Sequence, residues 1–246
     1  MKYPVKPDLP DHRDIPYTLT PAPQPDHISW RSRYPQVWNQ GDIGSCTAQA
    51  MSAAVAYFTP SIDPSRMFQY YNERKIDGDV SSDTGSTIRT ACKAASSYGI
   101  CDEPLWPYIN SHLFLQPPET CYQNAVKDTL STYYRIAPND GPDTISAIRN
   151  AVAIGQPVVI GIVAFEGLES SEAAQTGVVP MPVVSQAPLG GHAIVLTGYS
   201  NETQLFQFRN SWGEGWGDKG YGYFPYAYFD QYLMSSWVVT GDKRSN

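Results

Sequence analysis

The sequence predicts an α+β protein with two lobes, the first mainly helical and the second built on a β-sheet. Two observations predict this division: the first half holds an alanine-rich run with helix start and stop signals, and β-branched and aromatic runs dominate from about residue 131 onward. The 246 residues, 41% of them hydrophobic, suffice for two closely packed lobes with a buried core. A cleft between the lobes is the default place for a functional site.

Residues 1–28 are rich in proline and aspartate and show no hydrophobic periodicity. They predict an extended arm on the surface of a domain that covers residues 29–246, with a helical lobe over about 29–130 and a β lobe over about 131–246. The arm either lies across part of the cleft or packs on the back of the lobes, and we favour the back.

Three helices are expected in the first lobe. Residues 46–58 are alanine-rich, follow a glycine-containing loop and stop before Pro60, which predicts a buried helix. Residues 64–75 have a proline near their start, and residues 86–98 are closed by Gly99, the residue type that favours a left-handed cap.

The second lobe begins with one more helix, near residues 143–153. The β-branched and aromatic runs that follow predict strands at residues 157–163, 192–199, 204–209, 220–224 and 236–240.

The charge balance excludes some partners. A formal net charge of −7 gives no basic surface for nucleic acid or an anionic membrane. No stretch approaches the roughly 18 apolar residues of a membrane span. The first residues lack the apolar core of a signal peptide, which favours a cytoplasmic location, although a secreted form without its signal would look the same. We expect a monomer.

No metal or cofactor is expected. The four histidines are scattered, and the chain holds no CxxC, HExxH or EF-hand spacing. Residues 215–220 fit the GxGxxG pattern of dinucleotide sites, but they lead into alternating tyrosines and not into a helix. We interpret them as a β-turn.

The four cysteines are Cys46, Cys92, Cys101 and Cys121. If Cys46 stays a thiol for catalysis, the other three allow at most one internal disulfide. Cys101 and Cys121 could form it in an oxidising compartment, while three buried free thiols are an equally good interpretation.

Cys46 is the candidate nucleophile. A thiol attacks as the thiolate, and the N-terminus of a helix and a neighbouring imidazolium both lower a thiol's pKa. Taken alone, a cysteine at a helix start is more often a small buried hydrophobe. Here Gly41 and Gly44 let a substrate carbonyl approach closely, and Gln40 places a side-chain amide where it can meet a developing oxyanion.

His192 and Asn210 are the candidate partners of that thiol. His192 follows two glycines and opens an apolar run, so it should stand at the start of a core strand. Asn210 ends the next predicted strand; if the two strands pair, it can orient the imidazole while Trp212 shields their hydrogen bond. A core histidine and a strand-end turn residue are the alternatives for each one alone.

Taken together, residues 40–46, His192 and residues 210–221 resemble the motifs of the papain-like cysteine peptidases, in that family's order. The resemblance covers about residues 29–239 and implies the papain-like two-lobe fold with a β-barrel-like second lobe. The chain lacks one of the family's disulfides, which suits a microbial or viral member.

The resemblance also implies the chemistry. Cys46 would be the nucleophile, His192 the general base and acid and Asn210 its orienter, while Gln40 and the Cys46 backbone N–H would form the oxyanion hole. The reaction would be hydrolysis of peptide bonds through a thioester by an endopeptidase. A peptide or protein substrate and a protein inhibitor are the partners to expect.

Substrate-binding residues follow from the same resemblance. Residues 85–87 look like the family segment that holds an extended peptide by backbone hydrogen bonds, with Ser86 in place of its second glycine. The full predicted set is Gly44, Ser45, Gly85, Ser86, Thr87, Gly191 and Trp212.

The chain departs from the family pattern at several positions. Thr47 replaces an aromatic residue, and Gly191 replaces a polar one. Ile43 and Asp83 stand where the family has two cysteines, so that whole bridge is absent. Residues 165–189 form an insertion that could be a lid or shape the primed side of the cleft.

Two alternatives stay open. A papain-fold acyltransferase, such as a transglutaminase, deamidase or peptide ligase, would share the thioester but use another acceptor. A non-catalytic relative would use the cleft only to bind peptides, but it would have no need of Cys46, His192, Asn210 and Gln40 together.

Overall fold

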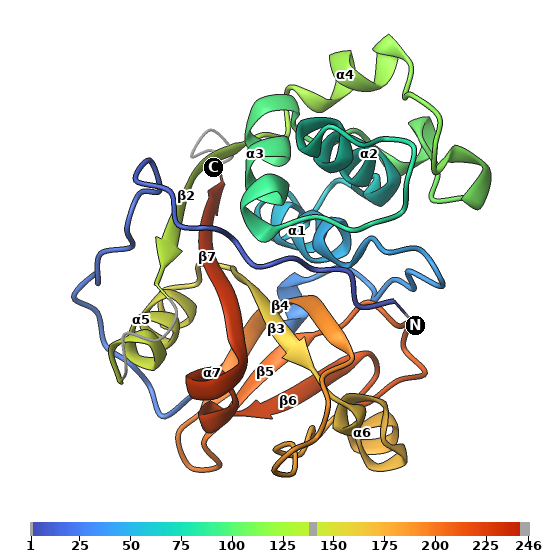
Figure 1. Cartoon of the computed structure of the whole chain (residues 1–246). Helices are drawn as coiled ribbons and strands as arrows, with labels where there is room; N and C mark the ends of the chain where they lie inside the picture. The colour runs from blue at the N-terminus through green and yellow to red at the C-terminus, as the bar shows by residue number, and fades with distance from the viewer. Residues whose placement is uncertain (1, 138–141, 242–246) are drawn as a thin grey trace.

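The computed structural model describes residues 2–137 and 142–241 and has the two predicted lobes (Figure 1). The first lobe is helical, and all neighbouring strands of the second run antiparallel. The helices of the first lobe are α1 (Cys46–Phe58), α2 (Arg66–Asp77), α3 (Ile88–Tyr98) and α4 (Glu119–Ala125). The α+β prediction is confirmed.

Capping residues define the helix ends. Ser65 accepts a hydrogen bond from the Phe68 N–H at the start of α2, and Gly78 ends that helix in the left-handed conformation with φ 83°. Thr87 caps α3 in the same way, which explains why α3 starts two residues later than the sequence predicts. The helix predicted at 46–58 is confirmed as α1.

The second lobe is a seven-stranded sheet in the order β2-β7-β3-β4-β5-β6, with β1 paired to β4. Five of its strands were predicted; β1 and β2 were not. Helix α5 (Pro142–Ala153) was also predicted, whereas α6 (Ser171–Thr176) and α7 (Tyr226–Tyr232) were not. The strands are β1 (His27–Ser29), β2 (Leu130–Ile136), β3 (Val158–Ala164), β4 (Gly190–Ser200), β5 (Leu205–Arg209), β6 (Tyr221–Pro225) and β7 (Leu233–Gly241).

The sheet is open, so the prediction of a β-barrel-like lobe is wrong. Its edge strands β2 and β6 pair with extended segments and not with each other. On β2, Arg135 accepts a backbone hydrogen bond from Tyr17 of the arm; on β6, Tyr223 accepts one from Val179 and donates one to Gly177. Because these segments satisfy the edge groups, the sheet is protected without closure.

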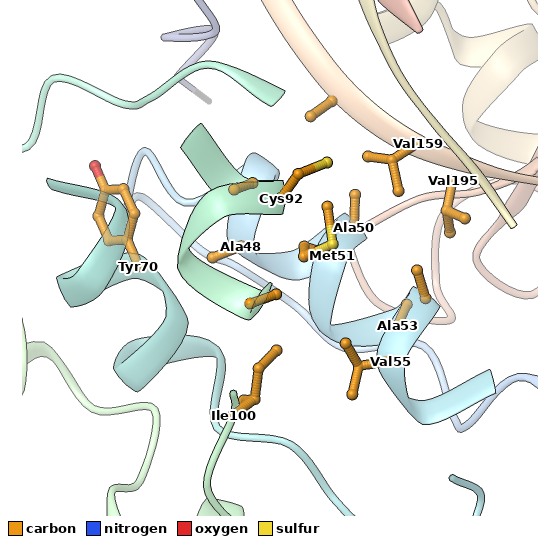
Figure 2. Close-up of a cluster of buried hydrophobic side chains, with 14 of the residues drawn as sticks. Ala48, Ala50, Met51, Ala53, Val55, Tyr70, Cys92, Ile100, Val159 and Val195 are labelled. Carbon is orange, nitrogen blue, oxygen red and sulfur yellow. The ribbon is translucent and has the colours of Figure 1, made fainter. Parts of the chain in front are cut away.

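Helix α1 lies between the lobes and forms the centre of the core (Figure 2). Ala48, Ala50 and Ala53 are buried, and their small side chains let the sheet approach, so that Val159 and Val195 belong to the same cluster. A residue at the start of α1 therefore lies at the junction of the lobes.

Two sequence questions are answered by the fold. All four cysteines are free and buried, so Cys101 and Cys121 do not form a disulfide here. Within residues 2–137 and 142–241, no helix is long and apolar enough to cross a membrane.

Candidate active site

Cys46 is the first residue of α1 and is fully buried. The loop before it turns tightly, with the Ser45 N–H donating to the Ile43 carbonyl at 2.8 Å. The backbone N–H of Ala193 faces the sulfur from β4 and favours the thiolate form. The helical lobe thus presents the predicted nucleophile to the strand that carries His192.

Asp83 holds the loop before Cys46 in place. Its carboxylate accepts from the Gly44 N–H at 3.0 and 3.1 Å and from the Tyr70 hydroxyl at 2.6 Å. The same hydroxyl accepts from the Gly85 N–H at 3.1 Å. These hydrogen bonds join two loops where the sequence indicates that a family disulfide is absent.

His192 and Asn210 are brought together by the sheet. His192 pairs with Ile162 of β3, and Asn210 directly follows β5. The His192 Nε2–H donates to Asn210 Oδ1 at 2.9 Å, which leaves Nδ1 free to accept a proton. Within the described residues this buried Nδ1 has no hydrogen-bond partner. Trp212 covers the imidazole, with ring centroids 5.1 Å apart.

Gln40 is oriented by the segment after Asn210. Its Oε1 accepts from the Ser211 hydroxyl, its Nε2 donates to the Ile43 carbonyl at 3.0 Å, and its backbone N–H donates to the Ser211 carbonyl at 2.8 Å. An amide nitrogen carries two hydrogens, so a second donor remains for a ligand. Sequence reasoning missed the role of Ser211, although it stands inside the motif that was recognised.

Burial governs the protonation of the predicted pair. It raises the pKa of the Cys46 thiol to about 12, and it lowers the pKa of His192 to about 4 against the opposing effect of the Asn210 hydrogen bond. The expected lowering of the thiol pKa is therefore wrong for this closed state, in which both groups are neutral. Both side chains are 0% exposed, and burial disfavours the charged form of each.

The N-terminal arm occupies the cleft. Gly191 donates to the Tyr3 carbonyl at 3.0 Å and accepts from the Val5 N–H at 3.1 Å, and the Lys6 N–H donates to the Ser86 carbonyl at 3.3 Å. In Figure 1 this blue segment runs between the helical lobe above and the sheet lobe below. The favoured position on the back of the lobes is wrong for residues 2–6.

Glycines make room for this segment. A Cβ added to Gly85 would lie 2.4 Å from the Pro4 carbonyl oxygen, and one on Gly44 would lie 3.0 Å from Pro4 Cγ. The approach at Gly85 is too close for a side chain, and the one at Gly44 would force a neighbouring group to shift. Predicted binding residues Gly44, Gly85 and Gly191 thus line the path of an extended chain.

The other predicted binding residues have structural partners. Ser45 contacts the Tyr108 hydroxyl at 2.6 Å, the Ser86 hydroxyl donates to Asp77 at 2.7 Å, and Thr87 caps α3. Ser86 contacts the arm through its backbone carbonyl, which accepts from the Lys6 N–H. Trp212 contacts the arm through Tyr3, with ring centroids 6.2 Å apart.

The rest of the arm belongs to the body of the fold. Asp8 is buried and accepts from the Trp237 indole N–H at 2.7 Å and the Arg89 N–H at 3.2 Å. Asp14 forms ion pairs with Arg89 at 2.6 Å and Arg135 at 3.0 Å. Removal of the whole arm would therefore disturb the lobes as well as open the cleft.

Among the residues described, no cluster of three His, Cys, Asp or Glu side chains is placed to hold a metal ion. A buried cysteine, a histidine oriented by an amide and a nearby amide donor are the groups that acyl transfer through a thioester requires. Fold and site together define a cysteine peptidase, a hydrolase of the papain-like type.

Comparison with known proteins gives the family. A family model described as papain family cysteine protease matches residues 24–239. A peptidase C1-like protein of Acanthamoeba polyphaga mimivirus is 36% identical over 82% of this chain and 68% of its own length. The chain belongs to the papain family of cysteine proteases.

Solved structures agree with this assignment. Xylellain, a cysteine protease from Xylella fastidiosa, is 33% identical, covers 98% of this chain and 96% of its own, and gives a TM-score of 0.88. A cysteine protease of Carica candamarcensis in complex with E-64 is 26% identical over 89% of this chain and all of its own, with a TM-score of 0.67. The chain spans 49% of the Ambrosia artemisiifolia cysteine protease and 61% of mouse pro-cathepsin H.

Proposed function

We propose that this protein is an endopeptidase that hydrolyses peptide bonds through a thioester on Cys46. The observation that carries the proposal is the orientation of the His192 side chain. Asn210 accepts its Nε2–H, and its buried Nδ1 has no hydrogen-bond partner among the described residues. The backbone N–H of Ala193 faces the Cys46 sulfur, and Ala193 directly follows His192 in the chain. The free Nδ1 of His192 therefore belongs to the neighbour of the residue that donates a hydrogen bond to the thiol. This placement supports the assignment of Cys46 as the nucleophile and His192 as its base.

The acylation step follows from these positions. His192 Nδ1 accepts the thiol proton, and the thiolate attacks the carbonyl carbon of the substrate. The negative oxygen that forms is stabilised by the free Gln40 N–H and the Cys46 backbone N–H at the start of α1. The imidazolium then protonates the leaving amine, the C–N bond breaks, and a thioester remains.

Deacylation returns the enzyme to its starting state. His192 removes a proton from a water molecule, whose oxygen attacks the thioester carbonyl. The C–S bond breaks, a carboxylic acid leaves, and the proton passes back to the Cys46 sulfur. Asn210 accepts the Nε2–H throughout and keeps Nδ1 directed at the reacting atoms.

The arm keeps this site closed. From Tyr3 to Lys6 it runs from the His192 side of the cleft to the Ser86 side. A substrate must run the other way, because its N-terminal part becomes the acyl group and its C-terminal part leaves beside the general acid. An arm of reversed direction does not offer its own peptide bonds in a reactive orientation, so it blocks the cleft without being cut.

Labelling with a papain-directed epoxide of the E-64 type tests the proposal. The full chain, a Tyr3→Ala variant and a variant lacking only residues 2–6 would be compared by mass mapping, with Cys46→Ala as control. We expect a stoichiometric adduct on Cys46 that forms faster when the arm is weakened. No adduct in any of the three proteins under reducing conditions would refute an activated nucleophile and favour a peptide-binding relative.

Product analysis separates hydrolysis from acyl transfer. A reactive peptide would be incubated with the Tyr3→Ala protein, with and without an added primary amine. A free carboxylate as the main product in both reactions supports the peptidase, whereas dominant amide formation would show that the acceptor is the amine.

A further inference from the structure

Tyr3 of the arm marks a subsite of the cleft. Its ring meets the His192 and Trp212 rings edge-on, with centroids 5.9 and 6.2 Å away and interplanar angles of 82° and 75°. Its hydroxyl donates a hydrogen bond to Glu169. The His192 and Trp212 rings and the Glu169 carboxylate thus hold one side chain of an extended peptide.

Glu169 is available for such a contact. It ends the 3-10 helix η4 (Glu166–Glu169), which follows β3, and it is exposed at the rim of the cleft. Within the described part of the chain, no lysine, arginine or histidine forms an ion pair with this carboxylate, and Tyr3 is its hydrogen-bond partner. A ligand that displaces Tyr3 meets an unpaired acceptor.

The position of Tyr3 relative to His192 identifies the subsite. The general acid must reach the leaving nitrogen, so the side of the cleft next to His192 and Trp212 receives the C-terminal part of the substrate. Val5 and Lys6 occupy the opposite side. There the Val5 side chain is buried, with 5% of its surface exposed, and its Cγ1 would lie 3.3 Å from a Cβ added to Gly161. The contact of Tyr3 with His192 places it at the first residue of the leaving group.

We propose that Glu169 is a specificity-determining residue for the first residue of the leaving group, where it selects a long side chain that ends in a hydrogen-bond donor. Tyrosine, lysine and arginine fit this description, whereas phenylalanine lacks the donor and glutamate repels the carboxylate. Arginine and lysine can also lie against the Trp212 face through a cation–π contact. The proposal rests on the peptidase function argued above and names a substrate class for it.

Peptide cleavage gives the first test. The full chain carrying Tyr3→Ala, which empties the subsite, would be given four peptides that differ only at the first residue after the scissile bond: tyrosine, phenylalanine, arginine or glutamate. Because the carboxylate is exposed, we expect kcat/KM to favour tyrosine over phenylalanine by about three- to tenfold, and arginine over glutamate by at least about tenfold.

A matched pair of variants assigns the preference to one carboxylate. Glu169→Gln should reduce the arginine to glutamate ratio to about threefold or less, because the charge is gone while the shape is kept. Glu166→Gln removes the same charge three residues earlier, where the side chain meets Gln186 at 3.4 Å, and should leave the ratio unchanged. Equal cleavage of all four peptides, or equal effects of the two variants, would overturn the proposal.

A second measurement does not depend on cleavage. Alkylation of Cys46 by iodoacetamide would be followed in the full chain and in Tyr3→Phe, Glu169→Gln and the double variant. If the hydroxyl and carboxylate hold each other, each single variant should raise the rate about three- to tenfold, and the double variant no further. Unchanged alkylation rates in the single variants, or a double variant whose rate increase is the product of the two single increases, would refute the subsite. If none of the peptides is cleaved but the double variant alkylates no faster than the single variants, only the peptidase function is refuted.

Discussion

The two sides of the cleft are held in place by different means. On the helical side, Cys46 stands next to Thr47, whose hydroxyl donates to the buried Glu73 at 2.5 Å, while Asp83 fixes the loop before it. On the sheet side, His192 and Asn210 are positioned by the ladders that join β3, β4 and β5. Titratable side chains position Cys46, whereas backbone pairing positions His192.

This difference predicts different sensitivities. Hydrogen bonds to carboxylates depend on protonation and on single atoms, so the helical side should respond to pH and to isosteric substitutions. Ladder hydrogen bonds and aromatic packing do not titrate, so the sheet side should lose chemistry before it loses stability.

Glu73 should make folding strongly pH-dependent. Burial raises its pKa to about 8, while the hydrogen bonds from Thr47 and Gln69 oppose this shift. Because the folded-state pKa lies above the unfolded value, the stabilisation is complete below about pH 4 and is lost as the pH rises through about 8. The free energy of unfolding should fall by on the order of 5 kcal/mol over that window.

Glu73→Gln is the matched test, since it keeps the shape and removes the titration. Urea unfolding at intervals from pH 5 to 9 should show a steep decline for the parent chain and a much flatter one for the variant. Parallel curves would mean that Glu73 does not titrate in the fold, and the contrast between the two sides of the cleft would be lost.

Asn210→Ala tests the sheet side. The change removes the acceptor of the His192 Nε2–H and lets the imidazole rotate, so we expect kcat to fall about 100-fold. The backbone N–H of residue 210 still donates to Gly220 at 3.0 Å, but the Ser211 N–H and the imidazole lose their buried acceptor, so the free energy of unfolding should fall by only about 1–2 kcal/mol. A loss of stability as large as the loss of activity would show that the amide supports the fold and not the chemistry.

Asp83→Asn tests the loop before Cys46. Asn keeps one acceptor oxygen but loses the charge that faces the Gly44 N–H and the Tyr70 hydroxyl. We expect a loss of about 1–2 kcal/mol in the free energy of unfolding. Tyr70→Phe should cost a similar amount, and the double variant should cost less than the sum, because the two side chains share one network. Strict additivity would exclude that network.

The sequence could predict the chemical groups because they lie in short, ordered motifs. Gln40, Cys46, His192 and Asn210 were predicted from those motifs, and the structure brings His192 and Asn210 within hydrogen-bond distance. Helices α1, α2, α3 and α5 were predicted for a similar reason, since caps such as Thr87 and Gly78 act over only a few residues, whereas the short α4, α6 and α7 were not predicted. Sequence signals that act over a few residues therefore predict structure that depends on a few residues.

Contacts between distant segments could not be predicted. The open sheet depends on arm and loop segments that pair with β2 and β6, and no sequence motif predicts these contacts. Tyr3 and Glu169 are 166 residues apart, and each is an ordinary residue in its own segment. Thr47 was noted only as a departure from the family pattern, because its partner Glu73 lies on another helix.

Lys2 should contribute least to holding the arm in the cleft. Its ion pair with Asp83 is 2.5 Å long, but the lysine side chain is 49% exposed, so solvent screens the attraction. Lys2→Ala should raise the rate of Cys46 alkylation by less than about threefold, and 1 M salt should abolish even that difference. Tyr3→Ala, measured alongside, removes ring contacts that salt does not screen and should have the larger effect. If Lys2→Ala instead opened the cleft as far as Tyr3→Ala does, the arm would be held by charge on the helical side and not by the ring and backbone contacts of the sheet side.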